Sequence, residues 1–64
     1  MIVNGKELSC VEEITVLQLL KLLGLDSQRV AVEKNGEIVP RAHFAEETLC
    51  PADSIEIVQF VGGG

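Results

Sequence analysis

Three consecutive glycines occupy the end of the sequence, directly after the apolar residue Val61. Glycine lacks a Cβ atom, so it adopts backbone conformations closed to other residues and lets another surface approach closely. Three extended residues reach about 10 Å, at about 3.5 Å per residue. Such a segment could carry the carboxylate of Gly64 away from a folded domain and into the active site of another protein. The alternative is a frayed end, because chain termini are often disordered.

The other side chains able to do chemistry are few, and they argue against a self-contained enzyme. Cys10 and Cys50 are too few for a disulfide framework and lack the clustered spacing of a zinc site. Both are therefore interpreted as reduced and mostly buried. His43 stands alone near a predicted turn and is interpreted as structural or solvated, with no metal role. The glycines before the tail are isolated, so we expect no phosphate-binding loop and no cofactor on this chain.

Composition sets further bounds on the class of protein. The 64 residues predict one domain with a small core, because a chain of this size buries only about 60% of its unfolded surface. An apolar share of 47% indicates a folded domain. The net charge of −5 argues against a nucleic-acid partner, and no apolar stretch is long enough to span a membrane. No leader-like pattern opens the sequence, so we expect a cytoplasmic protein.

Two Asn-Gly pairs, at positions 4–5 and 35–36, predict β-hairpins because each lies between short β-prone runs. Pro40 cannot donate a ladder hydrogen bond and is expected to end the second hairpin. Residues 41–50 are predicted to be irregular with at most one helical turn, and Phe44 and Leu49 are expected to be buried. The first hairpin is expected to turn one side of its strands toward the core: Met1, Val3, Leu8 and Cys10.

A helix is predicted over residues 15–24. Thr15 is the expected N-cap and Gln18 completes a capping box, while Ile14 is placed to contact Leu19. Gly24 is the expected left-handed C-terminal cap, after which Leu25 folds back over the helix. At 100° per residue, one side of the helix is an apolar stripe formed by Val16, Leu19, Leu20 and Leu23.

The last predicted strand, residues 54–61, is apolar on both faces near its end. Ile55 and Ile57 share one face, whereas Val58 and Phe60 share the other. Because the sequence supplies one helix, only one face of the sheet is covered. Val58 and Phe60 are therefore expected to form an exposed apolar patch next to the glycine tail.

These elements predict an α+β roll in which the last strand lies parallel to and beside the first, at the centre of the sheet. The folded domain is expected to span residues 1–61, with residues 62–64 as a flexible tail. This element order with a glycine end resembles the ubiquitin-like β-grasp families over the whole chain. It implies a mixed sheet of four to five strands with one helix packed across one face.

Within these families the chain is similar to the ThiS family of sulfur carriers of thiamin biosynthesis. The resemblance rests on the Ile-Val-Pro-Arg segment at 38–41, on Phe44 three residues later, and on the Asp-Ser-Ile-Glu-Ile-Val segment at 53–58 before the glycines. Ala52 departs from the family pattern, which usually has glycine before the aspartate. That departure bears on the geometry of this turn and leaves the tail unaffected.

The resemblance implies a carrier protein that is itself no enzyme. An adenylating, E1-like activating enzyme would use ATP to adenylate the Gly64 carboxylate. Sulfur from a donor such as a cysteine desulfurase would convert the adenylate to a thiocarboxylate, which a thiazole synthase would consume. Gly62 and Gly63 would thread into these partners, and Val58, Phe60 and Val61 would form the partner-binding surface.

Several alternatives to this interpretation stay open at the level of sequence. The same tail chemistry would serve a sulfur carrier for molybdopterin or for tRNA thiolation. A ubiquitin-like modifier would form isopeptide bonds through the same terminus. A β-grasp binding module would leave its glycines idle.

Overall fold

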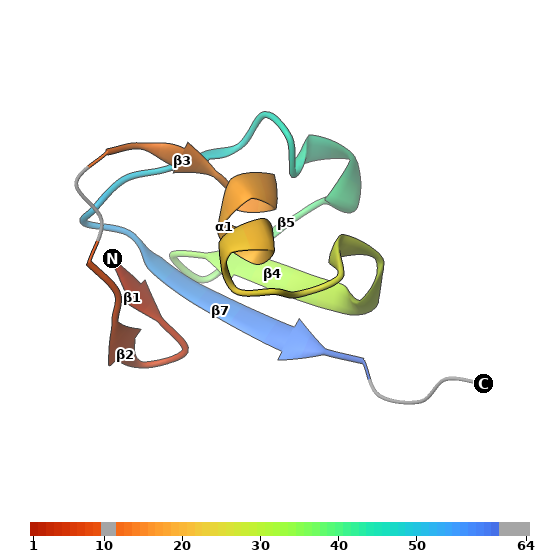
Figure 1. Ribbon diagram of the computed structural model, residues 1–64, viewed down its shortest axis with the longest axis horizontal. Coiled ribbons are helices and arrows are strands. Elements are labelled where there is room, and N and C mark those ends of the chain that lie inside the picture. The colour runs from red at the N-terminus through yellow and green to blue at the C-terminus, as the bar shows by residue number, and fades with distance from the viewer. Residues whose placement is uncertain (10–11, 61–64) are drawn as a thin grey trace.

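The computed structural model describes residues 1–9 and 12–60. The two predicted hairpins form part of a mixed sheet, and the predicted helix lies on one side of it (Figure 1). Cys10, Val61 and Gly62–Gly64 lie outside the described residues. The inward position expected for Cys10, the tail, and the boundary between domain and tail therefore stay predictions.

Both Asn-Gly pairs form the predicted two-residue turns. The first joins β1 (Ile2–Val3) to β2 (Lys6–Glu7), and the second joins β4 (Val30–Lys34) to β5 (Glu37–Val39). All four turn residues have positive φ, from 51° at Asn4 to 87° at Gly36. Two consecutive positive φ angles define the type I′ turn, whose twist matches that of the flanking strands. Asparagine and glycine are the residues that adopt this conformation at least cost.

The helix α1 (Val16–Leu22) has both predicted caps. Thr15 Oγ1 accepts a hydrogen bond from the Gln18 N–H at 3.1 Å, and Gln18 Oε1 accepts one from the Thr15 N–H at 2.8 Å. At the other end, the Leu25 N–H donates to the carbonyl of Leu20 and the Gly24 N–H donates to that of Lys21. With φ of +72° at Gly24, these two bonds form a Schellman motif.

The buried stripe of α1 is shorter than the sequence predicts. Val16, Leu19 and Leu20 are buried, but Leu23 is 38% exposed, so its place in the stripe was predicted wrongly. The physical reason is the cap itself, because the helix ends at Leu22 and the left-handed Gly24 reverses the chain. Leu25 is brought back over the helix end and packs against the core. The predicted return of Leu25 over the helix is therefore confirmed.

The main sheet has the strand order β2-β1-β7-β4-β5, and α1 lies on one side of it (Figure 1). The last strand, β7 (Ser54–Gln59), runs parallel to β1 and antiparallel to β4. The prediction that the last strand lies centrally beside the first is confirmed. The mixed sheet of five strands with one helix is the β-grasp arrangement expected from the sequence.

A second, two-stranded sheet was not predicted. Its strands are β3 (Ile14–Thr15) and β6 (Thr48–Leu49), which pair in an antiparallel fashion. Two single-turn 3₁₀ helices, η1 (Ser27–Arg29) and η2 (Arg41–His43), complete the described elements. The chain after η2 also caps α1, because the carbonyls of Phe44 and Glu47 accept hydrogen bonds from N–H groups of its first turn.

The core lies between α1 and the inner face of the main sheet. Phe44 is 3% exposed and Leu49 is fully buried, as predicted. No side-chain nitrogen or oxygen buried in the described part of the chain lacks a hydrogen-bond partner. The buried apolar residues are Met1, Val16, Leu19, Leu20, Val30, Val32, Val39, Phe44, Leu49, Ile55 and Ile57.

Asp53 closes the turn that leads into β7. Its carboxylate accepts hydrogen bonds from the Cys50 N–H at 2.7 Å and from Asn35 Nδ2 at 3.0 Å. The bond from the Cys50 N–H is the main cause of a lowered pKa of Asp53, and the Asn35 amide adds to it. Asn4 and Asn35 are the non-glycine residues with positive φ among those described, so Ala52 fits this turn in an ordinary conformation.

We expect the lowered pKa of Asp53 to make the domain sensitive to acid. Because the folded pKa lies below the unfolded value of 3.8, the carboxylate stabilises the fold above that pH. This contribution is lost as pH falls through the folded pKa. In urea unfolding, Asp53→Asn should therefore lower stability at pH 7 and flatten its decline below about pH 4. The exposed Glu46→Gln should keep the wild-type profile, and parallel profiles for Asp53→Asn would contradict the assignment.

Candidate functional site

The end of β7 displays apolar side chains on the side of the sheet that α1 leaves uncovered. Ile55 and Ile57 point into the core, with exposures of 0% and 8%. Val58 is 54% exposed and Phe60 is 56% exposed. The predicted exposure of these two residues is confirmed, whereas their role in binding a partner stays a prediction. Val61, the third residue of the predicted binding surface, lies outside the described residues.

Backbone and side-chain hydrogen bonds hold β7 on both of its edges. On the β1 side, Asn4 Nδ2 donates to the Ile57 carbonyl at 3.2 Å and Asn4 Oδ1 accepts from the Ile57 N–H at 2.6 Å. On the other side β7 pairs with β4, and the Phe60 N–H then donates to the Arg29 carbonyl at 2.8 Å. The chain is therefore fixed up to Phe60, the last described residue.

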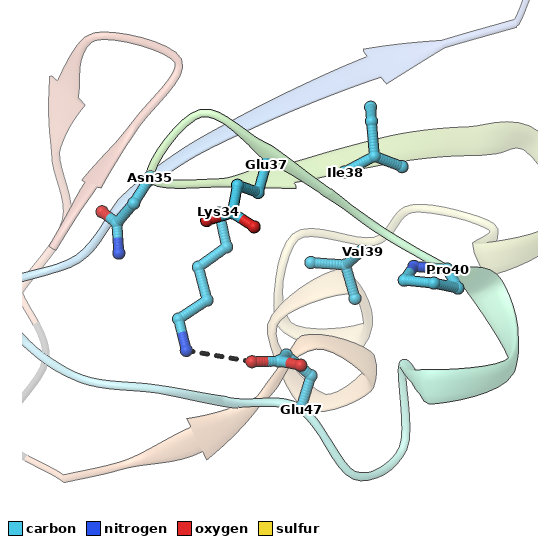
Figure 2. A pocket seen from close by; sticks show the side chains of 7 residues that line it. All are labelled: Lys34, Asn35, Glu37, Ile38, Val39, Pro40 and Glu47. Carbon is cyan, nitrogen blue, oxygen red and sulfur yellow. Dashed lines mark hydrogen bonds and ion pairs between the residues drawn. The ribbon is translucent and has the colours of Figure 1, made fainter.

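Four apolar residues at this end of the sheet are named here the outer-face patch: Ala31 on β4, Ile38 on β5, Val58 on β7 and Phe60 directly after β7. Ala31 lies directly opposite Val58 in the β4–β7 register. Ile38 projects from β5 on the side opposite to Val39, as Figure 2 shows, and is 64% exposed. Exposed apolar groups that adjoin one another in this way are typical of interaction surfaces.

A shallow pocket of about 240 Å³ lies beside Phe60. Sequence reasoning missed this pocket, because its walls come from elements that are far apart along the chain. The sequence feature that comes closest to indicating the pocket is the Val-Pro-Arg segment at 39–41, because these residues form part of its wall. The lining residues are Val30, Ala31, Ile38, Val39, Pro40, Arg41, Phe44 and Phe60.

Arg41 fastens the wall of this pocket to the rest of the domain. Its Nε donates to the Ser27 carbonyl at 2.9 Å and its Nη2 donates to the Val30 carbonyl at 3.0 Å. Both partners of the Arg41 guanidinium are therefore main-chain carbonyls. The side chain thus ties η2 to the start of β4.

A second pocket of similar volume lies along β5, shares Ile38, Val39 and Pro40 with the first, and is shown in Figure 2. Lys34 crosses it, with Nζ at 3.0 Å from Glu47 Oε2 and at 3.0 Å from the Thr48 carbonyl. The hydrogen bond with Glu47 is the main cause of a raised pKa of Lys34. Because Lys34 is already neutralised by Glu47, it joins β4 to the segment before β6 and offers little free charge to a ligand.

Two further candidate side chains lie among the described residues, Cys50 and His43. Cys50 is half-buried, and its Sγ donates to Glu13 Oε2 at 3.2 Å, which is the main cause of a raised pKa of the thiol. The protonated thiol is therefore favoured. His43 is exposed, and its carbonyl accepts the N–H groups of Glu46 and Glu47.

The described residues contain neither a metal-ligand cluster nor a helix that could span a membrane. Within residues 1–9 and 12–60, no three His, Cys, Asp or Glu side chains are grouped as a metal site would require. In the same part of the chain, α1 is far too short to cross a bilayer and no longer apolar helix occurs.

A five-stranded mixed sheet with one helix on its inner face defines the chain as a ubiquitin-like β-grasp domain. It superimposes with a TM-score of 0.80 on the crystal structure of the thiamine biosynthesis protein ThiS from Geobacter metallireducens. The two sequences are 36% identical, and the match covers 98% of this chain and 96% of that one. Residues 1–64 match the ThiS family. The chain belongs to the ThiS family.

The relatives of this chain include a protein of about its own length and much longer proteins. The sulfur carrier protein ThiS of Bacillus subtilis is 42% identical over 62 residues, which cover 95% of this chain and 94% of that protein. A thiazole synthase of Paramagnetospirillum magneticum is 45% identical over 64 residues, all of this chain. The chain spans only 20% of the length of that thiazole synthase.

Proposed function

We propose that this chain is a sulfur carrier protein of thiamine biosynthesis and that Gly64 is the residue that carries the sulfur. The observation that carries the proposal is the match to the ThiS family over residues 1–64. The 42% identity to the Bacillus subtilis sulfur carrier, over nearly the full length of both chains, supports it further. The domain itself acts as a co-substrate and catalyses no step.

The proposed chemistry begins with activation of a poor acyl donor. A carboxylate oxygen of Gly64 attacks the α-phosphorus of ATP on an adenylating enzyme, and pyrophosphate leaves. A sulfur nucleophile from a donor, such as the persulfide of a cysteine desulfurase, then attacks the acyl carbon and AMP leaves. A thiol supplies the two electrons that cleave the remaining S–S bond, which releases the thiocarboxylate. The setting is cytoplasmic, where ATP and the thiol are at hand.

The proposed consumer of the thiocarboxylate is a thiazole synthase. This step rests on the relative from Paramagnetospirillum magneticum, a protein named thiazole synthase that contains a region 45% identical to the whole of this chain. A second thiazole synthase, from Magnetococcus marinus, contains a region 38% identical to 95% of this chain. The synthase takes the sulfur and returns the carboxylate of Gly64.

The outer-face patch is proposed to supply the binding energy that the tail cannot. Ordering the glycines at 62–64 inside a partner costs about 3–6 kcal/mol, at about 1–2 kcal/mol per residue. Burial of about 200 Å² of apolar surface contributes about 5 kcal/mol, at about 25 cal/mol per Å². Val58 and Phe60 lie at the base of the tail and are exposed, so docking them offsets the cost of threading Gly62 and Gly63.

The function is tested by intact mass spectrometry. The chain is incubated with an adenylating enzyme, ATP, cysteine, a cysteine desulfurase and a thiol. The expected product has one oxygen of the Gly64 carboxylate replaced by sulfur. The Bacillus subtilis carrier serves as the positive control. If that control is converted while this chain keeps the mass of the free acid, the proposed function is wrong.

Phe60→Asp is expected to weaken activation without unfolding the domain, because the side chain is 56% exposed and contacts the solvent. Loss of a central apolar anchor costs about 2 kcal/mol, so the KM for the carrier in ATP–pyrophosphate exchange should rise about 30-fold. The matched control is Leu22→Asp, because Leu22 is 69% exposed and lies on α1, away from the outer face. Equal KM values for the two variants would show that the outer-face patch does not bind the adenylating enzyme.

A further inference from the structure

The register of the sheet places two glutamates directly opposite each other on its uncovered face. Glu33 of β4 is the partner of Glu56 of β7. The residues next to them, Val32 and Ile57, are partners too, and both are buried in the core. Because successive side chains alternate between faces, Glu33 and Glu56 point outward. Like charges directly opposite in an antiparallel pair destabilise the sheet.

No described cation offsets this repulsion. The structure contains two salt bridges among its described residues, Arg29 with Asp26 and Lys34 with Glu47, and neither involves the glutamate pair. Lys34 has the same strand parity as Val32, so it leaves the sheet on the inner side. Among the described strands, the residues that alternate onto the outer face include no lysine and no arginine. Glu7, the partner of Ile2 in β2, adds a third negative charge to that face.

The glutamate pair borders the outer-face patch directly. Ile38 is the partner of Glu33 on the β5 side, and Ala31 and Val58 form the neighbouring outward row. The pocket beside Phe60 lies at the end of this patch that is farther from the glutamates. The two rows lie two residues apart along β4 and β7. A complementary surface must therefore offer an apolar side chain to the pocket and, beside it along the strands, a positive charge to the glutamates.

We propose that the outer face docks a protein surface on which a projecting apolar side chain is flanked by arginine or lysine, and that Glu33 and Glu56 are its charge-recognising residues. The inference rests on the proposed function, since that surface belongs to the adenylating enzyme. A second copy of this chain is disfavoured as the occupant because two outer faces would bring two glutamate pairs together. The net charge of −5 opposes self-association in the same way.

The test compares charge-neutral variants in ATP–pyrophosphate exchange with the adenylating enzyme of the same organism. The double variant Glu33→Gln, Glu56→Gln should raise the KM for the carrier about 10-fold at low salt with kcat unchanged. The difference should shrink at high salt, because screening weakens the wild-type contact. Glu46→Gln, an exposed acid outside the sheet, should leave KM unchanged.

Measurements of stability and of self-association distinguish a loss of docking from unfolding and from dimerisation. The double variant should be at least as stable to urea as the wild type, because a repulsive pair is removed, so a raised KM cannot be ascribed to unfolding. Equal KM values for wild type and double variant would overturn the docking proposal while leaving carrier function intact. Absence of any exchange with the wild type, beside an active Bacillus subtilis carrier, would instead overturn the proposed function. Dimerisation of the wild type that the double variant abolishes would assign the face to a second copy.

Discussion

A chain that lacks Gly63 and Gly64 is expected to fold as the full chain does and to lose sulfur transfer completely. Every described contact of the core and of β7 lies at or before Phe60, so the deletion removes none of them. The chemistry is lost because the thiocarboxylate must form at the end of a segment that reaches a partner's active site. Without two of its three glycines, the tail is shorter by about 7 Å.

The deletion separates a carrier from a binding module with idle glycines. Circular dichroism and urea unfolding should give the wild-type curves, and thiazole formation in a reconstituted assay should be absent. Binding to the adenylating enzyme should persist in part, because the outer-face patch is intact. A truncated chain that still supports thiazole formation would show that the tail is dispensable. Phe60→Asp provides the complementary defect, with weakened docking and an intact tail.

Leu19→Ala is expected to remove much of the stability of the domain. The side chain is fully buried between α1 and the sheet, and truncating a buried leucine costs about 2–5 kcal/mol. A domain of this length has only about 3–10 kcal/mol to lose, at about 0.05–0.15 kcal/mol per residue. The variant should therefore unfold at a much lower urea concentration or be partly unfolded in buffer.

The same substitution three residues later is the control. Leu22 is 69% exposed on the same helix, so Leu22→Ala changes the same atoms and should alter stability by less than about 0.5 kcal/mol. The contrast tests the position of the core independently of helix propensity, since both sites gain the same alanine. Equal destabilisation by the two substitutions would mean that α1 packs through a different face.

The features that the sequence predicted correctly are those governed by local rules. An Asn-Gly pair specifies a type I′ turn through the φ angles of two residues, and both turns formed as expected. The capping box at Thr15 and the left-handed cap at Gly24 are likewise set within a few residues. The exposure of Val58 followed from strand alternation and from the presence of a single helix.

The features that were missed depend on contacts between distant segments. β3 and β6 are two residues each, too short to show an alternating pattern, and they exist only because residues 14–15 meet residues 48–49. The partners of Arg41 are main-chain carbonyls, which leave no mark on the sequence. The pocket beside Phe60 and the opposition of Glu33 to Glu56 follow from strand register, which the hydrophobic pattern alone did not reveal.

The parallel pairing of β1 with β7 has a consequence for synthesis on the ribosome. Ile2 lies beside Ser54, so β1 pairs with β2 early but finds its parallel neighbour only after more than fifty further residues have been added. Such long-range pairing closes a large loop and is slow compared with helix or hairpin formation. Until β7 emerges, β1 and β4 have no common neighbour and the main sheet is split into two hairpins. A nascent chain therefore acquires its complete sheet only when the segment that bears the tail has left the exit tunnel, and an unfinished domain has no docking face to present.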